Sequence, residues 1–80
     1  MATKTRQGRD PRREVLQKLG EKVRTYRHAR GLTQEALADS VHLSIAYVSL
    51  IERGWRNPPY TTVVEIAQAL GVSPRDLSIE

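Results

Sequence analysis

Apolar residues along most of this chain recur at steps of three and four positions, the period of an α-helix. The first such stripe consists of Val15, Leu16, Leu19, Val23 and Tyr26. Asp10-Pro11 precedes the stripe and Gly31 follows it. Because Asp caps free amide groups, proline fits the first helical position and glycine accepts a left-handed conformation, we expect a helix over roughly residues 11–30. Gly20 inside it costs about 1 kcal/mol relative to alanine, so we expect its first turns to fray.

Two short helices are predicted next, each beginning at a hydroxyl residue that can cap the free amide groups. Thr33 opens the first, which directs Leu37 and Ala38 inward. Ser44 opens the second, which Gly54 closes. Its core-facing residues are Tyr47, Val48 and Ile51.

Two further helices follow an extended turn that Asn57-Pro58-Pro59 enforces. The fourth apolar stripe ends at Gly71 and consists of Tyr60, Val63, Ile66, Ala67 and Leu70. Ser73-Pro74 repeats the cap-then-proline start and opens a short fifth helix that carries Leu77. No stretch reads as a strand, so the predicted fold class is all-α in five helices.

The positive charge of the chain is concentrated at its N-terminus. The net charge is +4, and the first thirteen residues contain all of this excess. Their basic residues, opposed only by Asp10, are Lys4, Arg6, Arg9, Arg12 and Arg13. We expect a basic arm over residues 1–10, disordered until a partner binds, and one domain over residues 11–80. Such an arm suits a polyanion, although a solubilising tail has the same composition.

Several functional classes are excluded by what the sequence lacks. It has no cysteine, and His28 and His42 have no companions at metal-ligand spacing, so we expect neither a metal nor another cofactor. No acid, base and nucleophile gather in a motif, and 80 residues leave little room for a catalytic cleft, so we expect no enzyme. The absence of a long apolar run or signal peptide predicts a cytoplasmic protein away from membranes.

The segment from Gly31 to Leu77 resembles the Cro/repressor, or Xre-type, helix-turn-helix family. The resemblance lies in the Leu-Thr-Gln opening, the Ile-Glu-Arg-Gly close of the third helix, the Arg-Asn-Pro turn and the Ala-Leu-Gly-Val-Ser end. It implies a five-helix, lambda-repressor-like domain whose third helix enters the major groove of double-stranded DNA.

The resemblance also implies which residues meet DNA. Base-reading positions at the front of the third helix hold Ile45, Ala46, Ser49 and Leu50. Phosphate-contacting positions hold Gln34, Ser44, Arg53, Trp55, Arg56 and Asn57. Family members commonly place Gln, Arg, Lys or Asn at the first set, and this chain departs from that pattern. Ile and Ala can pack on a thymine methyl but cannot pair with base edges, so we expect thymine-biased readout helped by DNA shape.

Alternatives remain for several of these residues. Ser44 can serve the helix cap as well as a phosphate, and Gln34 can be a plain surface residue. Ile45 can pack on a neighbouring side chain, and Trp55 can be purely structural. The arm can follow phosphates, enter the minor groove or contact no DNA.

Three residues test the resemblance structurally. Arg27 and Glu52 match a pair that the family often joins as a buried salt bridge between the first and third helices. His42 stands where the family usually has glycine, so we expect it to have positive φ. Tyr60 fits a core position of the fourth helix better than a DNA contact.

The leading hypothesis is a transcriptional repressor or autoregulator that binds a partly palindromic operator as a weak or DNA-assembled homodimer. Late apolar candidates for the dimer contact are Val72, Leu77 and Ile79. The alternative is a protein-interaction module, similar to an antitoxin or a cofactor protein, that uses Ile45, Ala46 and Leu50 as an apolar contact patch.

Overall fold

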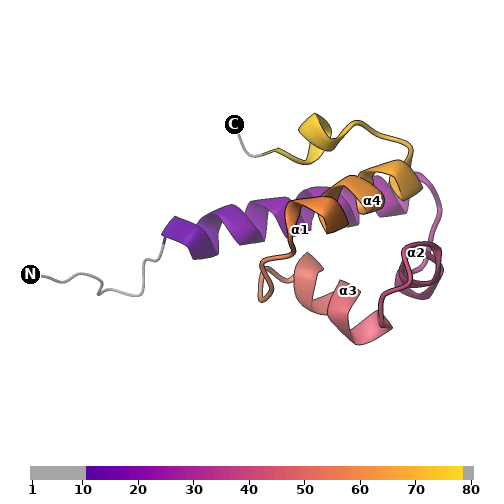
Figure 1. Ribbon diagram of the computed structural model, residues 1–80, viewed down its shortest axis with the longest axis horizontal. Coiled ribbons are helices and arrows are strands. Elements are labelled where there is room, and N and C mark those ends of the chain that lie inside the picture. The colour runs from indigo at the N-terminus through magenta and orange to yellow at the C-terminus, as the bar shows by residue number, and fades with distance from the viewer. Residues whose placement is uncertain (1–10, 79–80) are drawn as a thin grey trace, which may run out of the picture.

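The computed structural model describes residues 11–78, and all regular structure within that range is helical (Figure 1). The elements are α1 (Pro11–Ala29), α2 (Gln34–Ser40), α3 (Ile45–Glu52), α4 (Tyr60–Leu70) and a 3₁₀ helix, η1 (Pro74–Leu77). The all-α prediction is confirmed.

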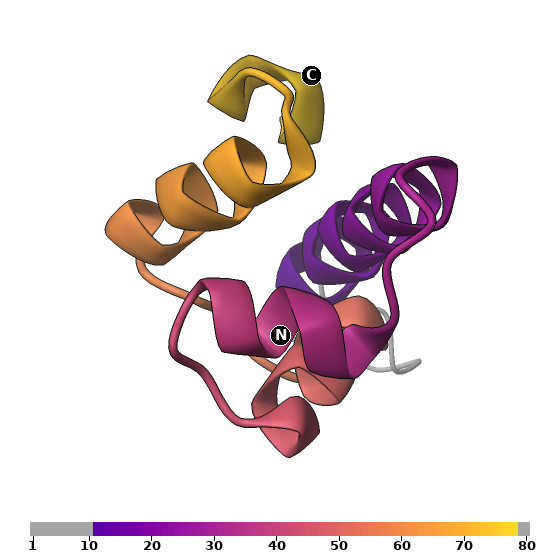
Figure 2. The same cartoon turned by 90° about the vertical axis from the view of Figure 1, so that its right-hand side faces the viewer.

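The helices form three levels in space. α1 and α4 occupy the middle, α2 and α3 lie together on one side of them, and η1 lies on the other side (Figures 1 and 2). α3 packs against both α1 and α2, and η1 packs mainly against α4. The short helices are thus held against a longer scaffold, as their length requires, because isolated helices of this size are marginal in water.

One apolar core connects all five elements. Its buried members are Val23, Leu37, Ala38, Val41, Val48, Ile51, Ile66, Ala67, Leu70 and Leu77. Leu19, Tyr26, Tyr47 and Val63 pack around it while remaining partly exposed. Each helix therefore contributes one side to the core, as the periodic patterns predict.

The predicted helix boundaries are confirmed at the caps. The Thr33 and Ser44 hydroxyl oxygens each accept a hydrogen bond from a backbone amide three residues later, at 3.0 Å. His42 has φ of 58°, a left-handed conformation that lets the chain turn between α2 and α3. The fifth helix differs from its prediction in type. It is a single 3₁₀ turn of four residues, opened by Ser73 and Asp76 in a capping box.

Two apolar residues predicted to face the core are exposed instead. Tyr60 is 71% exposed and Val15 is 46% exposed, so both assignments are wrong. Tyr60 is the first residue of α4 and Val15 is the fifth residue of α1, so both lie near the start of a helix, where neighbouring elements cover less of it. They flank an apolar groove of about 700 Å³, which Leu16, Leu19 and Val63 also line.

One of the late apolar candidates for the dimer contact is corrected. Leu77 is 2% exposed and belongs to the core, so it cannot serve as a contact for a second molecule. Val72 is partly buried against the same core. Ile79 lies outside the described residues.

Gly20 has a structural role that its helix propensity conceals. A Cβ atom at this position would lie 2.5 Å from the carbonyl oxygen of Glu52, at the end of α3. Real side chains do not tolerate that separation, so glycine is what lets the backbones of α1 and α3 approach each other. Glycine at this position lowers the helix propensity of α1, but the close packing of α1 against α3 requires it.

We predict that Gly20→Ala lowers the free energy of unfolding by about 2 kcal/mol, because overpacking outweighs the better helix propensity of alanine. Urea unfolding followed by circular dichroism measures this. Lys18→Ala, at an exposed position of the same helix, is the control and should change stability little. A Gly20→Ala variant as stable as the wild type would contradict the close approach.

Candidate nucleic-acid interface

The front of α3 points away from the core. Ser44, Ile45 and Ala46 are exposed, and the Ile45 side chain retains 47% of its accessible surface. Ser49 and Leu50 are partly buried. On the opposite side of the helix, Val48 and Ile51 are each 1% exposed. These five residues, all predicted from the sequence to contact DNA, are therefore exposed at the start of α3 and more buried further along it.

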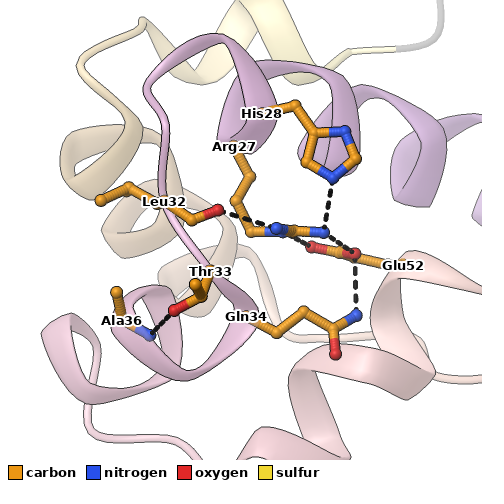
Figure 3. Close-up of polar contacts among 7 residues, drawn as sticks. All are labelled: Arg27, His28, Leu32, Thr33, Gln34, Ala36 and Glu52. Carbon is orange, nitrogen blue, oxygen red and sulfur yellow. Dashed lines mark hydrogen bonds and ion pairs between the residues drawn. The ribbon is translucent and has the colours of Figure 1, made fainter.

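A buried ion pair fixes the other end of α3. The Arg27 guanidinium donates from Nε to Glu52 Oε2 at 2.6 Å and from Nη2 to Glu52 Oε1 at 3.1 Å (Figure 3). The side chains are 8% and 3% exposed. Arg27 also donates from Nη1 to the Leu32 carbonyl at 2.8 Å. The expected pair is present, and it joins α1, the α1–α2 turn and α3.

Gln34 belongs to the same network. Its amide Nε2 donates to Glu52 Oε1 at 3.0 Å, which links the start of α2 to the end of α3 (Figure 3). No pattern in the sequence predicts this bond. An amide nitrogen carries two hydrogens, so the bond to Glu52 leaves one for an acceptor outside the domain.

His28 is a further unanticipated neighbour. Its Nε2 lies 3.2 Å from Arg27 Nη2. Since the guanidinium can only donate, a hydrogen bond between the two residues requires Nε2 to be the acceptor.

Polar and basic side chains gather in the loop after α3. Arg53, Trp55, Arg56 and Asn57 are all exposed, and Trp55 retains 56% of its surface. Arg56 donates from Nη1 to the Trp55 carbonyl at 3.1 Å. The loop thus presents two guanidinium groups and an amide beside α3.

The arm residues divide into two groups. Arg12 and Arg13 lie in the first turn of α1 and not in an extended arm. Arg13 donates to the carbonyls of Arg53, at 3.2 Å, and of Gly54. Lys4, Arg6 and Arg9 lie outside the described residues.

Residues 11–78 contain neither a candidate metal site nor a candidate membrane-spanning helix. No group of three His, Asp or Glu side chains among them is placed to hold a metal ion. None of their helices is both long and apolar enough to cross a membrane.

We predict that Arg27→Ala lowers the free energy of unfolding by about 3–5 kcal/mol, because it leaves the buried Glu52 carboxylate without its cation. Thermal unfolding followed by circular dichroism measures this. Arg24→Ala, at an exposed position of the same helix, is the control. An Arg27→Ala variant that kept its melting temperature and lost only DNA affinity would show that the pair is not structural.

The comparisons with known proteins agree with this geometry. Residues 18–78 match the family model described as "Helix-turn-helix domain". Control protein C.BamHI of Bacillus amyloliquefaciens is 44% identical over 59 residues, which cover 72% of this chain and 73% of that protein. The HTH-type transcriptional regulator y4dJ of Sinorhizobium fredii is also 44% identical, over 74% of this chain and 77% of that protein.

Solved structures give the same result. The restriction-modification controller protein C.AhdI of Aeromonas hydrophila superposes with a TM-score of 0.75 and is 42% identical, over 78% of this chain and 94% of that one. The clp gene regulator ClgR of Corynebacterium glutamicum superposes with a TM-score of 0.77 at 30% identity, over 79% of this chain and 81% of that one. This chain therefore belongs to the Xre-type helix-turn-helix family of DNA-binding transcriptional regulators.

Proposed function

We propose that this regulator is a sequence-specific repressor or autoregulator, which binds a partly palindromic operator as a homodimer. The observation that carries the proposal is the exposed front of α3, which lies next to a loop of basic and amide side chains. Similarity to a restriction-modification controller protein supports a controller role.

Base readout is assigned to the exposed front of α3. Ile45 and Ala46 offer only methyl and methylene groups, which match the methyl of thymine in the major groove. Ser49 follows one turn later and can donate or accept at a base edge. Leu50 is partly buried and would contact a base only at the margin. This combination favours thymine in each half-site and leaves other positions to DNA shape.

Backbone contacts are assigned to both ends of the helix-turn-helix. The loop supplies Arg53, Trp55, Arg56 and Asn57, whose N–H groups suit phosphate oxygens. At the start of α2, the second amide hydrogen of Gln34 is available to a phosphate, and the hydroxyl hydrogen of Ser44 is another donor since its oxygen serves the cap. Lys4, Arg6 and Arg9 of the arm would add phosphate or minor-groove contacts.

The dimer contact is assigned to the apolar groove flanked by Val15 and Tyr60. Symmetric dimers bury the same patch on both subunits, and a protruding Tyr60 beside a groove is the kind of self-complementary feature that this requires. The limited size of the groove is consistent with a weak dimer that assembles on DNA.

Selection of bound fragments from a random DNA pool tests this function. We expect an inverted repeat with thymine in each half-site, and affinity that falls steeply with salt.

Ile45→Gln should weaken binding to the selected sequence about tenfold and shift the preference towards adenine. Arg56→Ala should weaken binding to all sequences and flatten the log–log salt slope by about 0.9.

Arg75→Ala is the matched control for Arg56→Ala, because it removes an exposed arginine from η1, on the far side of the domain from α3 (Figure 1). It should leave both affinity and salt slope unchanged. A pool that yields no enriched sequence would contradict the proposed function and favour the protein-interaction hypothesis.

We predict that Tyr60→Arg weakens self-association about tenfold or more, since it places like charges at the symmetric contact. Analytical ultracentrifugation over a concentration series, with and without the selected duplex, measures the association constant. Thr61→Arg adds the same charge at the neighbouring exposed position and is the control. If both variants associate as the wild type does, the dimer uses another surface.

A further inference from the structure

The carboxyl end of α3 has a cation that comes from another helix. The last turn of α3 contains no basic residue. Carbonyls at a helix end lack intrahelical donors and carry partial negative charge, so a cation there is stabilising. Arg13 of α1 lies beside this end, where its Nη1 donates to the carbonyl of the C-cap residue Arg53 and to that of Gly54, which follows it. The C-cap of α3 is therefore bound by a side chain from forty positions earlier in the sequence.

The same guanidinium lies over the Trp55 ring. The Arg13 Cζ atom is 3.4 Å from the ring centroid, close enough for stacking and a cation–π interaction. A planar guanidinium can donate within its plane while it stacks through its face, which an ammonium group cannot do. Trp55 is still 56% exposed, so the ring is held by Arg13 and remains accessible.

The backbone at Gly54 packs tightly against the same part of α1. A Cβ atom at Gly54 would lie 2.8 Å from Arg13 Nη1 and 2.9 Å from the Gln17 Cα atom. Gly54 also has φ of 79°, which side chains disfavour. The start of the loop thus has no room to shift toward α1, and Arg13 prevents it from moving away.

We propose that Arg13 is a positioning residue for DNA binding, which fixes the loop of residues 53–57 in the conformation that presents Arg53, Trp55 and Arg56 to phosphates. This inference rests on the proposed function of the loop. Arg13 acts through its contacts with the two carbonyls and the indole, and not by contacting DNA itself. A loop ordered before binding loses less conformational entropy on the duplex, and so binds more tightly.

Three variants separate positioning from a direct charge contact. Arg13→Ala removes the guanidinium, Arg13→Lys retains the charge without the planar donor face, and Arg24→Ala removes an exposed arginine from the same helix. The first readout uses free protein. Trp55 is the only tryptophan of the chain, so its fluorescence reports on this contact. We expect a red-shifted emission and greater acrylamide quenching in both Arg13 variants, and no change in Arg24→Ala.

The second readout is affinity for a random-sequence DNA duplex, measured by fluorescence anisotropy of labelled DNA. We expect Arg13→Ala and Arg13→Lys each to bind about tenfold more weakly. A loss of this size is what removing the charge–carbonyl contact and the cation–π contact would cause. In a Trp55→Ala background, Arg13→Ala should cause a markedly smaller further loss, because the two residues act together. Arg24→Ala should bind as the wild type does.

Each result decides between the alternatives. Full affinity in Arg13→Lys would show that only the charge of Arg13 matters, and would overturn the positioning role. Unchanged tryptophan fluorescence in the Arg13 variants would overturn it as well. A wild-type protein that binds no duplex would instead refute the proposed function, whereas the fluorescence shift would still support the contact between Arg13 and Trp55.

Discussion

The Glu52 carboxylate is the point on which the arrangement of the domain depends. It lies at the end of α3, is almost fully buried, and accepts hydrogen bonds from Arg27 of α1 and Gln34 of α2. A buried carboxylate is tolerated only with such partners. The three helices must therefore be placed so that Arg27 and Gln34 both reach the Glu52 carboxylate. Apolar packing alone would allow more variation, because methyl groups have no preferred direction.

α1 supports the recognition helix at three points along one side. Arg13, Gly20 and Arg27 are spaced seven residues apart, which is close to two helical turns, so they lie on the same side of α1 over about 21 Å. Arg27 binds the Glu52 side chain, Gly20 admits the backbone at the end of α3, and Arg13 binds the first carbonyls of the loop. The length of α1 is explained by this task, since a shorter helix would leave the loop without support.

Local signals in the sequence predicted the features whose causes are local. The caps at Thr33 and Ser44 follow from hydroxyl chemistry, and they are present. The positive φ of His42 was expected from resemblance to a family that usually has glycine there, and it is present as well. The Arg27–Glu52 pair came from resemblance to a family, because no spacing rule joins residues so far apart.

Other features were inaccessible to sequence reasoning because they depend on where a neighbouring element ends. Periodicity placed Val15 and Tyr60 on apolar stripes without revealing that the rest of the described domain leaves much of both residues exposed. Arg13 looked like one more cation of a basic arm until the loop carbonyls were located. Gln34 was predicted to contact a phosphate, and nothing in the sequence indicated that its amide also donates to Glu52.

The missing side chain at Gly20 has an evolutionary consequence. Glycine at this position sets the separation between the backbones of α1 and α3, and therefore how far α3 protrudes from the rest of the domain. A larger residue there would have to displace or tilt α3, which would move all the residues proposed to contact bases at once. Specificity in such a family can thus drift through a position that never meets DNA, and substitutions at the reading surface are best compared between proteins that share this glycine.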